Sequence, residues 1–299
     1  MNISKNLNYF FILPAVLSIA AVIALLVWGL KPGIDLSGGS LLQATFSGSR
    51  PDSTAVQAVL GGLNLGEVRV QPADTSSYII RTRALSEQEH QAANQALAKL
   101  GTVHEDQFTT VGPTIGAELL QKAWIAIVLV VLCIIAFIAF AFRGVSKPVA
   151  SWKYGVVVIV TLLHDILVPA GFFAVFAHFV GAEVDSLFIL ALLTILGISI
   201  NDTIVVLDRI RENLGYNHEH SKREEFDQVV GRSIMQTLAR SINTSVTVVI
   251  VLAALYFMGP ETTKNLALML IVGMIAGTYS SIFLASPLLV LWQRWSGQK

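Results

Sequence analysis

The chain has 299 residues, of which 54% are hydrophobic and 13% are charged, and its twenty basic residues balance its twenty acidic ones. A soluble domain carries about 25% charged residues, so this composition excludes an ordinary water-soluble globule and favours an integral membrane protein. The neutral balance argues against a nucleic-acid-binding protein. The single cysteine, Cys133, excludes an internal disulfide framework and a multi-thiolate metal site.

Six segments contain no Lys, Arg or Glu and only two Asp, and each is long enough to cross a bilayer, which takes about 20 apolar residues. They predict six transmembrane helices, at 7–30, 123–142, 154–180, 186–207, 241–260 and 265–293. Lys and Arg are concentrated in the second-to-third and fourth-to-fifth connections. The positive-inside rule therefore predicts that both termini are cytoplasmic.

Residues 31–122, between the first two predicted spans, have the composition of a soluble domain. Alternating apolar and polar residues predict four strands, at 41–46, 67–71, 78–83 and 103–110. Helices are predicted at 52–60 and 86–100, the second opened by a capping box at Ser86 and Glu89. The order β-α-β-β-α-β is typical of a ferredoxin-like unit, so we expect an extracytoplasmic α+β domain without a catalytic constellation.

The long cytoplasmic connection before the fifth span contains apolar residues at helical spacing, at about 221–239. They predict an amphipathic helix at the inner membrane interface, with docking onto a partner's cytoplasmic face as the alternative. We therefore expect three parts: the N-terminus and first span at 1–30, the soluble domain at 31–122, and a five-helix membrane domain at 123–299 that includes this helix.

Asp165, Asp202 and Arg240 are ionisable residues within or at the edge of the predicted spans. Each costs about 2.5–3.5 kcal/mol at the centre of a bilayer, so such residues indicate function. Asp202 lies six residues before Asp208, hence about 9 Å inside the cytoplasmic end of its span, and Arg240 opens the fifth span from the same side. We expect Asp202 and Arg240 to pair, either as a proton relay or as an inert ion pair that fixes helix packing.

Polar residues share a helix face with each member of this predicted pair. Asn243 and Thr244 follow Arg240 at helical spacing, and Ser199 lies one turn before Asp202. Two facing polar stripes with one carboxylate and one guanidinium suit a relay, because a moving arginine can load and release a proton on the carboxylate.

Two further features are predicted to serve packing. Asp165 lies about 9 Å away in depth from Asp202, and His164 beside it points about 100° away on a helix, so the two form no site without partners. A satisfied buried contact is the favoured role of Asp165, and a place in the proton route is the alternative. Gly273 and Gly277, followed by Ser280 and Ser281, give the sixth span a small-residue face of the kind that allows close helix approach.

Four stretches resemble motifs of the SecD/SecF family of bacterial protein-export subunits. They are 33–39 after the first span, 111–119 at the start of the second, 199–213 in the fourth and 236–245 in the fifth. The fourth-span stretch is the most specific, and its triplet Asn201-Asp202-Thr203 resembles the SecF branch more than the SecD branch.

The resemblance implies a six-helix, half-sized relative of the resistance-nodulation-division transporters in the bacterial inner membrane. It implies that the chain pairs with SecD, acts with SecYEG on unfolded preproteins, and draws on the proton motive force without a cofactor or metal. By motif position, Asp202 corresponds to the family's proton-carrying aspartate and Arg240 to its arginine partner, and Thr244 is a weaker match.

Two other functions are compatible with parts of the pattern. An intramembrane aspartyl protease would use Asp165 and Asp202, but its two carboxylates must share a proton, and the difference in depth argues against this. An assembly scaffold without proton coupling would need neither carboxylate. We therefore expect a transport subunit and no enzyme activity.

Overall fold

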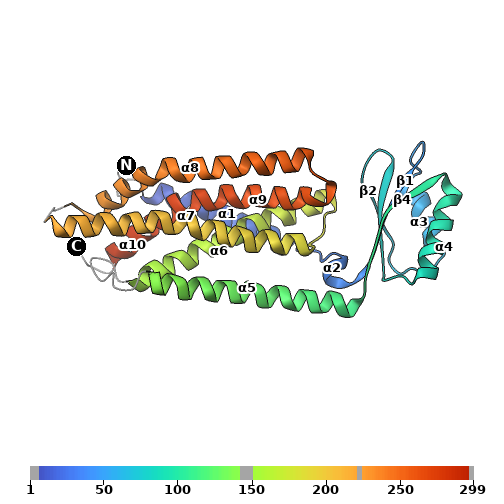
Figure 1. The fold of residues 1–299 in the computed structure, drawn as a ribbon, viewed down its shortest axis with the longest axis horizontal. Coiled ribbons are helices and arrows are strands. Elements are labelled where there is room, and N and C mark those ends of the chain that lie inside the picture. Colours follow the sequence, from blue (N-terminus) through green and yellow to red (C-terminus); the bar gives the residue numbers. More distant parts are fainter. Residues whose placement is uncertain (1–6, 142–150, 221–223, 296–299) are drawn as a thin grey trace. The chain divides into compact units, whose positions relative to one another are not determined.

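The computed structural model describes residues 7–141, 151–220 and 224–295. The chain forms two compact units (Figure 1). The helical unit comprises Met1–Leu30, Ile127–Val180 and Leu187–Lys299, and the sheet unit comprises Lys31–Ala126 and Gly181–Ser186. The short Gly181–Ser186 connection thus belongs to the sheet unit, although it joins two long helices in the sequence.

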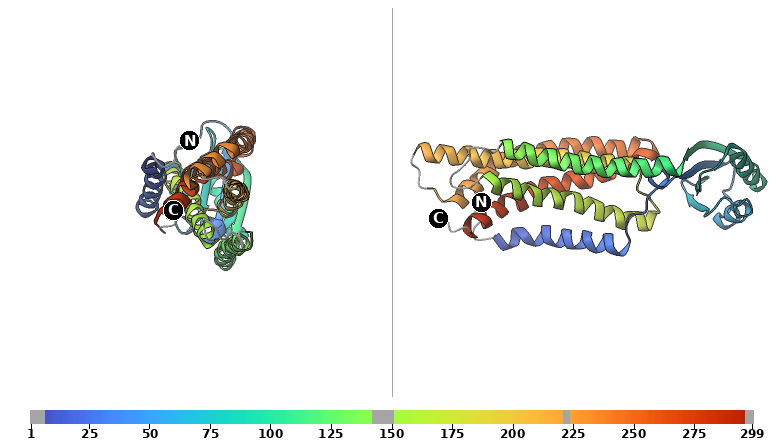
Figure 2. Two further views of the ribbon diagram at one scale, coloured as in Figure 1. Left: turned by 90° about the vertical axis from the view of Figure 1, so that its left-hand side faces the viewer. Right: turned by 90° about the horizontal axis from the view of Figure 1, so that it is seen from below.

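Long helices make up the helical unit and lie side by side with roughly parallel axes (Figure 2). Their bounds are α1 Leu7–Val27, α5 Pro113–Ala141, α6 Ser151–Val180, α7 Ser186–Glu219, α8 Phe226–Met258, α9 Glu261–Ser280 and α10 Ser286–Trp295. A π-helical turn at Ser281–Ala285 joins α9 to α10. Among the described residues, six helical segments are long and apolar enough to cross a membrane, which confirms the predicted number.

The helices of this unit share a buried apolar core. Tyr154 on α6, Leu196 and Leu207 on α7, Ile234 on α8 and Leu289 on α10 belong to one apolar cluster and are each at most 1% exposed. The outer faces of α5 and α8 instead carry many exposed apolar side chains. Apolar surfaces of this extent mark contact with a membrane or another protein.

The structure differs from expectation at the predicted amphipathic helix, 221–239. Residues 221–223 lie outside the described part of the chain, and the remainder continues without a break into the fifth span as α8. No proline interrupts Phe226–Met258, so the helical hydrogen bonds can run through the junction. The apolar face of the segment is buried in the helical unit, where Val230 and Ile234 join the core cluster. The segment therefore extends the bundle and is not a separate interfacial helix.

The sheet unit contains one antiparallel sheet, three α-helices that lie wholly within it, and residues 113–126 of α5. Its strands are β1 Gly39–Phe46, β2 Arg69–Pro72, β3 Ser77–Thr82 and β4 Val103–Val111, in the order β2-β3-β1-β4. Its helices are the short α2 Ile34–Ser37, α3 Ser53–Gly61 and α4 Glu87–Leu97. From β1 onward, the predicted order of elements is present. The helix predicted at 86–100 ends earlier than expected and tightens into a 3₁₀ turn at Ala98–Leu100.

Alternation along β1 determines which face of the sheet is buried. Leu42, Ala44 and Phe46 are at most 3% exposed, and the residues between them are partly exposed. These side chains form one apolar cluster with Leu60 of α3 and Leu97 of α4, both fully buried. Burial of each large apolar side chain contributes about 1.5–3 kcal/mol, which holds both helices on the sheet.

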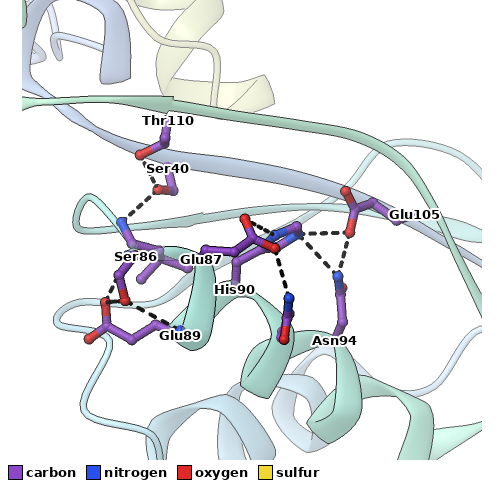
Figure 3. A network of polar contacts seen from close by, with 10 residues as sticks. Ser40, Ser86, Glu87, Glu89, His90, Asn94, Glu105 and Thr110 are labelled. Carbon is purple, nitrogen blue, oxygen red and sulfur yellow. Dashed lines mark hydrogen bonds and ion pairs between the residues drawn. The ribbon is translucent and has the colours of Figure 1, made fainter.

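Polar contacts position α4 at its start and along one face (Figure 3). The predicted capping box is present, because Ser86 Oγ accepts from the Glu89 N–H and the Glu89 carboxylate accepts from the Ser86 N–H. Further along the helix, His90 Nε2 lies 2.8 Å from Glu105 Oε2 on β4, and Asn94 donates to the same oxygen. The cap and this cluster together fix the register of α4 against β4.

Backbone hydrogen bonds attach the Gly181–Ser186 connection to the sheet unit. Val184 accepts from the Gly33 N–H and donates to the Lys31 carbonyl, both at 2.8 Å. Any side chain at Gly33 would press against the Val184 carbonyl, which explains the glycine that opens the 33–39 motif. The connection between α6 and α7 is therefore held by the residues that follow α1.

An ion-pair cluster also secures this connection. The Glu183 carboxylate lies 3.1 Å from Arg81 Nε on β3 and 3.5 Å from Arg69 on β2. Burial lowers the pKa of Arg81, and the Glu183 charge opposes this shift. The Glu183 carboxylate therefore compensates a guanidinium that has lost most of its contact with water.

Candidate functional site

A cavity of about 200 Å³ lies between α7, α8 and α9 of the helical unit. Its polar lining comes from all three helices and comprises Ser199, Asn201, Asp202, Arg240, Ser241, Thr244, Ser245 and Thr278. Small-molecule sites occupy about 300–1,000 Å³, whereas one water takes about 30 Å³. The cavity therefore suits a few water molecules and protons better than an organic ligand.

Asp202, on α7, is held by hydroxyl groups from two other elements. Ser241 Oγ on α8 donates to Oδ1 at 2.6 Å, and Ser281 Oγ in the π-helical turn donates to Oδ2 at 2.5 Å. A serine hydroxyl can donate a hydrogen bond or accept one. These two partners therefore fit Asp202 both as a carboxylate and as a protonated acid.

The structure brings Arg240 and Asp202 to the same cavity but not into contact. Both residues line it, and within the described residues no ion pair joins them. Thr244 also lines the cavity, and its hydroxyl donates to the Arg240 carbonyl at 2.9 Å. Asn243 is exposed and lies outside the lining, so only part of the predicted stripe faces Asp202.

The small-residue face of α9 sets its distance from α7. A Cβ added at Gly273 would overlap the Ile195 side chain, and one at Gly277 would lie 3.1 Å from Ser199 Cβ. The predicted packing role of this face is therefore confirmed within the chain. The close approach also lets Ser281, one turn beyond Gly277, reach the carboxylate on α7.

Sequence spacing does not reveal which hydroxyl groups meet Asp202. The predicted stripe on α8 begins at Arg240, yet Ser241 is the α8 residue that donates to the carboxylate. Ser281 begins a π-helical turn, a feature that is frequent at functional sites. Its contact depends on that turn and on the spacing of α9 and α7, neither of which a pattern of residue types shows.

Asp165 and His164 form a second polar cluster, on α6. Asp165 is fully buried, and its Oδ1 lies 2.9 Å from His164 Nδ1. Ser199 Oγ on α7 donates to the other oxygen. The sequence predicts no site for these two residues without partners, and Ser199 is such a partner from another helix.

The two aspartates bind different partners. Asp165 contacts His164 and Ser199, whereas Asp202 contacts Ser241 and Ser281. No hydrogen bond joins the two carboxyl groups in the described part of the chain, so they do not share a proton as an aspartyl protease requires. In the same residues, no group of three or more His, Cys, Asp or Glu side chains could hold a metal ion.

Comparison with known proteins identifies the family. The family model described as protein export membrane protein SecD/SecF, C-terminal, matches residues 91–295. The chain belongs to the SecD/SecF family. Within this family, it is 41% identical to protein translocase subunit SecF of Thermobaculum terrenum over 95% of this chain and 91% of that protein. The family assignment and the six apolar helices together make it a multi-pass membrane protein.

Fused SecDF proteins resemble the chain over part of their length. The SecDF subunit of Bacillus subtilis is 32% identical over 98% of this chain and 38% of its own length. The crystal structure of SecDF from Thermus thermophilus, described as a translocon-associated membrane protein, is 29% identical with a TM-score of 0.84 over 98% of this chain. This chain spans 39% of that SecDF chain.

Proposed function

We propose that the chain is an energy-coupling subunit of bacterial Sec protein export, in which protons bound in the Asp202 cavity drive preprotein translocation. Its SecF relatives are named protein translocase subunits, which supports a transport role and not an enzymatic one. One observation carries the proton part of the proposal: the carboxylate of Asp202, on an apolar helix, lines the same small cavity as Arg240.

The proposed topology places both termini in the cytoplasm and the sheet unit outside. With six spans, the connections after the first, third and fifth lie on one side of the membrane. The sheet unit contains residues of the first and third connections, Lys31–Ala126 and Gly181–Ser186, which supports this arrangement. The strand order β2-β3-β1-β4 and the order of its elements support a ferredoxin-like extracytoplasmic domain.

SecD is the proposed partner in the bacterial inner membrane. Two SecDF relatives contain sequence beyond the 38% and 39% that this chain matches, and we propose SecD as the partner equivalent to that sequence. The exposed apolar faces of α5 and α8 offer surface for lipid and for such a partner. SecYEG and unfolded preproteins complete the proposed set of partners.

In the proposed mechanism, a proton on Asp202 changes the forces between α7 and α8. The ionised carboxylate attracts the Arg240 guanidinium on α8, and protonation removes this attraction. The Ser241 and Ser281 hydroxyls adapt to both states by donating or accepting. Loading and release of the proton would therefore shift α8 against α7, and Thr244, bonded to the Arg240 carbonyl, would move with it.

The proton gradient supplies enough energy for such a shift. One charge crossing 100 mV releases about 2.3 kcal/mol, which changes a two-state equilibrium about fiftyfold. Asp202 is carried by α7, which begins at Ser186 in the connection held by the sheet unit. Movement of α7 would pull on Glu183 and its arginine partners, which gives the proton step a route to the extracytoplasmic domain.

The test is preprotein export in membranes whose SecF-type subunit is this chain with Asp202→Asn. The matched control is Asp208→Asn, the same chemical change six residues further along α7, where the carboxylate is exposed and 3.5 Å from Arg211. We expect the first variant to assemble normally and lose the part of export that depends on the proton gradient, and the control to retain it. Normal proton-dependent export by Asp202→Asn would refute coupling and favour a scaffold.

A further inference from the structure

A second titratable pair lies in the helical unit outside the lining of the Asp202 cavity. Asp165 is fully buried and His164 is 4% exposed. His164 Nδ1 lies 2.9 Å from one carboxylate oxygen, and Ser199 Oγ donates to the other. Both oxygens of Asp165 are therefore satisfied, on one side by an imidazole and on the other by a hydroxyl group.

The other edge of the imidazole has no such partner. His164 Nε2 is a buried nitrogen without a hydrogen bond in the described structure, and the Tyr279 hydroxyl on α9 is in the same condition. The two rings are neighbours, with centroids 6.3 Å apart. A buried polar atom without a partner costs about 1–3 kcal/mol. When Nδ1 carries the hydrogen that faces Asp165, Nε2 keeps a free lone pair, which is where a further proton can bind.

Charge balance favours proton uptake by this pair. A neutral His164 that donates through Nδ1 to an ionised Asp165 leaves one net negative charge in a buried site, where an uncompensated charge is costly. A proton added at Nε2 converts the imidazole to imidazolium, and the pair then carries no net charge. On the neighbouring helices, Tyr279 of α9 has its ring beside His164, and Asp202 of α7 lies one turn beyond Ser199. The other charged residues of these helices are Asp208, Arg209, Arg211, Glu212 and Glu219, six or more residues beyond Asp202 on α7, and Glu261 and Lys264, in the first turn of α9. The described side chains of α1 add none.

Ser199 connects this pair with the proposed relay. Its hydroxyl donates to Asp165, and the same residue lines the Asp202 cavity one helical turn from Asp202. The Cβ of Ser199 is also where Gly277 brings α9 against α7. A change in the charge of the His164–Asp165 pair therefore acts on Ser199, whose hydroxyl group can reorient its hydrogen bond beside the cavity.

We propose that His164 and Asp165 form a second proton-binding site, linked to the Asp202 cavity through Ser199. This inference rests on the proposed function, because it assigns the site to the same proton route. His164 and Asp165 bind one proton on α6, and Ser199 transmits the change in charge to Asp202 on α7.

The test is a pH titration of the ¹⁵N-labelled imidazoles by NMR, with the full-length chain in lipid bilayers. The chain has six histidines, and His164→Asn identifies the signal that belongs to this site. We expect the His164 signal to change from that of a neutral imidazole to that of an imidazolium during the titration. With Asp202→Asn, its midpoint should fall by at least about 0.5 pH unit, a threefold loss of proton affinity, because the proposal has the Ser199 hydroxyl group relay the charge of Asp202 to the pair.

Ser199→Ala provides the control for the connection. In its presence, Asp202→Asn should no longer move the His164 midpoint if the hydroxyl group carries the coupling. The inference would be overturned if His164 stayed neutral throughout the titration, or if its midpoint were the same in the wild type and in Asp202→Asn. Loss of export in Asp202→Asn with a silent His164 would refute only this inference. A coupled His164 with normal export in Asp202→Asn would refute only the proposed function.

Discussion

Glu183 offers the sharpest test of how the α6–α7 connection is held. Its side chain is 10% exposed, and its carboxylate contacts Arg81, which is 16% exposed, and Arg69. Glu183→Gln keeps the shape but removes the charge that compensates a buried guanidinium. Breaking a fully buried pair costs about 3–5 kcal/mol and an exposed pair costs about 0–1 kcal/mol. At this intermediate burial, we expect about 1.5–3 kcal/mol.

Amide hydrogen exchange at Val184 measures this cost, because its N–H is bonded to the Lys31 carbonyl. A loss of about 1.5–3 kcal/mol corresponds to exchange that is about 10- to 150-fold faster. Glu67→Gln is the matched control, since Glu67 also pairs with Arg69 but is 74% exposed, and it should leave Val184 unchanged. Equal exchange at Val184 in wild type and Glu183→Gln would refute the argument that the ion pairs hold the connection.

Three further predictions concern the sheet unit and the helix packing. Hydrogen bonds from Arg83 and Ser86 lower the pKa of Glu89 to about 2. The stabilisation of the folded state by the ionised Glu89 is therefore present above the unfolded pKa of about 4.3 and is lost as the pH falls towards 2. Amide protons of α4 should exchange faster with solvent as the pH falls through this range, and the change should be smaller in Glu89→Gln. Gly273→Val should lower the free energy of unfolding by about 1–3 kcal/mol through overpacking, as measured by thermal denaturation in detergent, whereas Gly197→Val, with open space around it, should not. Leu60→Ala should cost about 2–5 kcal/mol, seen as faster exchange along β1, and unchanged exchange there would contradict the assigned core.

Local signals in the sequence predict most of the elements. The alternation of Leu42, Ala44 and Phe46 identifies β1, and the capping box at Ser86 and Glu89 marks the start of α4. Each of these features depends only on residues a few positions apart in the sequence, so a local pattern of residue types is enough to predict it. The continuity of α8 was not predicted, because a charged, amphipathic stretch and an apolar span can belong to one helix whenever nothing breaks the backbone between them.

The candidate site was predicted only in part, for a different physical reason. Spacing along one helix identifies Asp202 as unusual, but its partners are set by helix rotation and by the distance between helices. Ser281 reaches the carboxylate because α9 lies close against α7 and continues in a π-helical turn. Asp165 and its neighbour His164 gain Ser199 as a partner only through the packing of α6 against α7.

Proton flux across a membrane would show whether Asp202 is the residue that binds the transported proton. The chain and its proposed SecD partner would be reconstituted in vesicles with a pH-sensitive dye inside, and an imposed proton gradient would be followed in the wild type, Asp202→Asn and Asp208→Asn. We expect proton uptake in the wild type and in Asp208→Asn, and its loss in Asp202→Asn. Equal uptake in all three would contradict the assignment of Asp202 as the proton-binding residue.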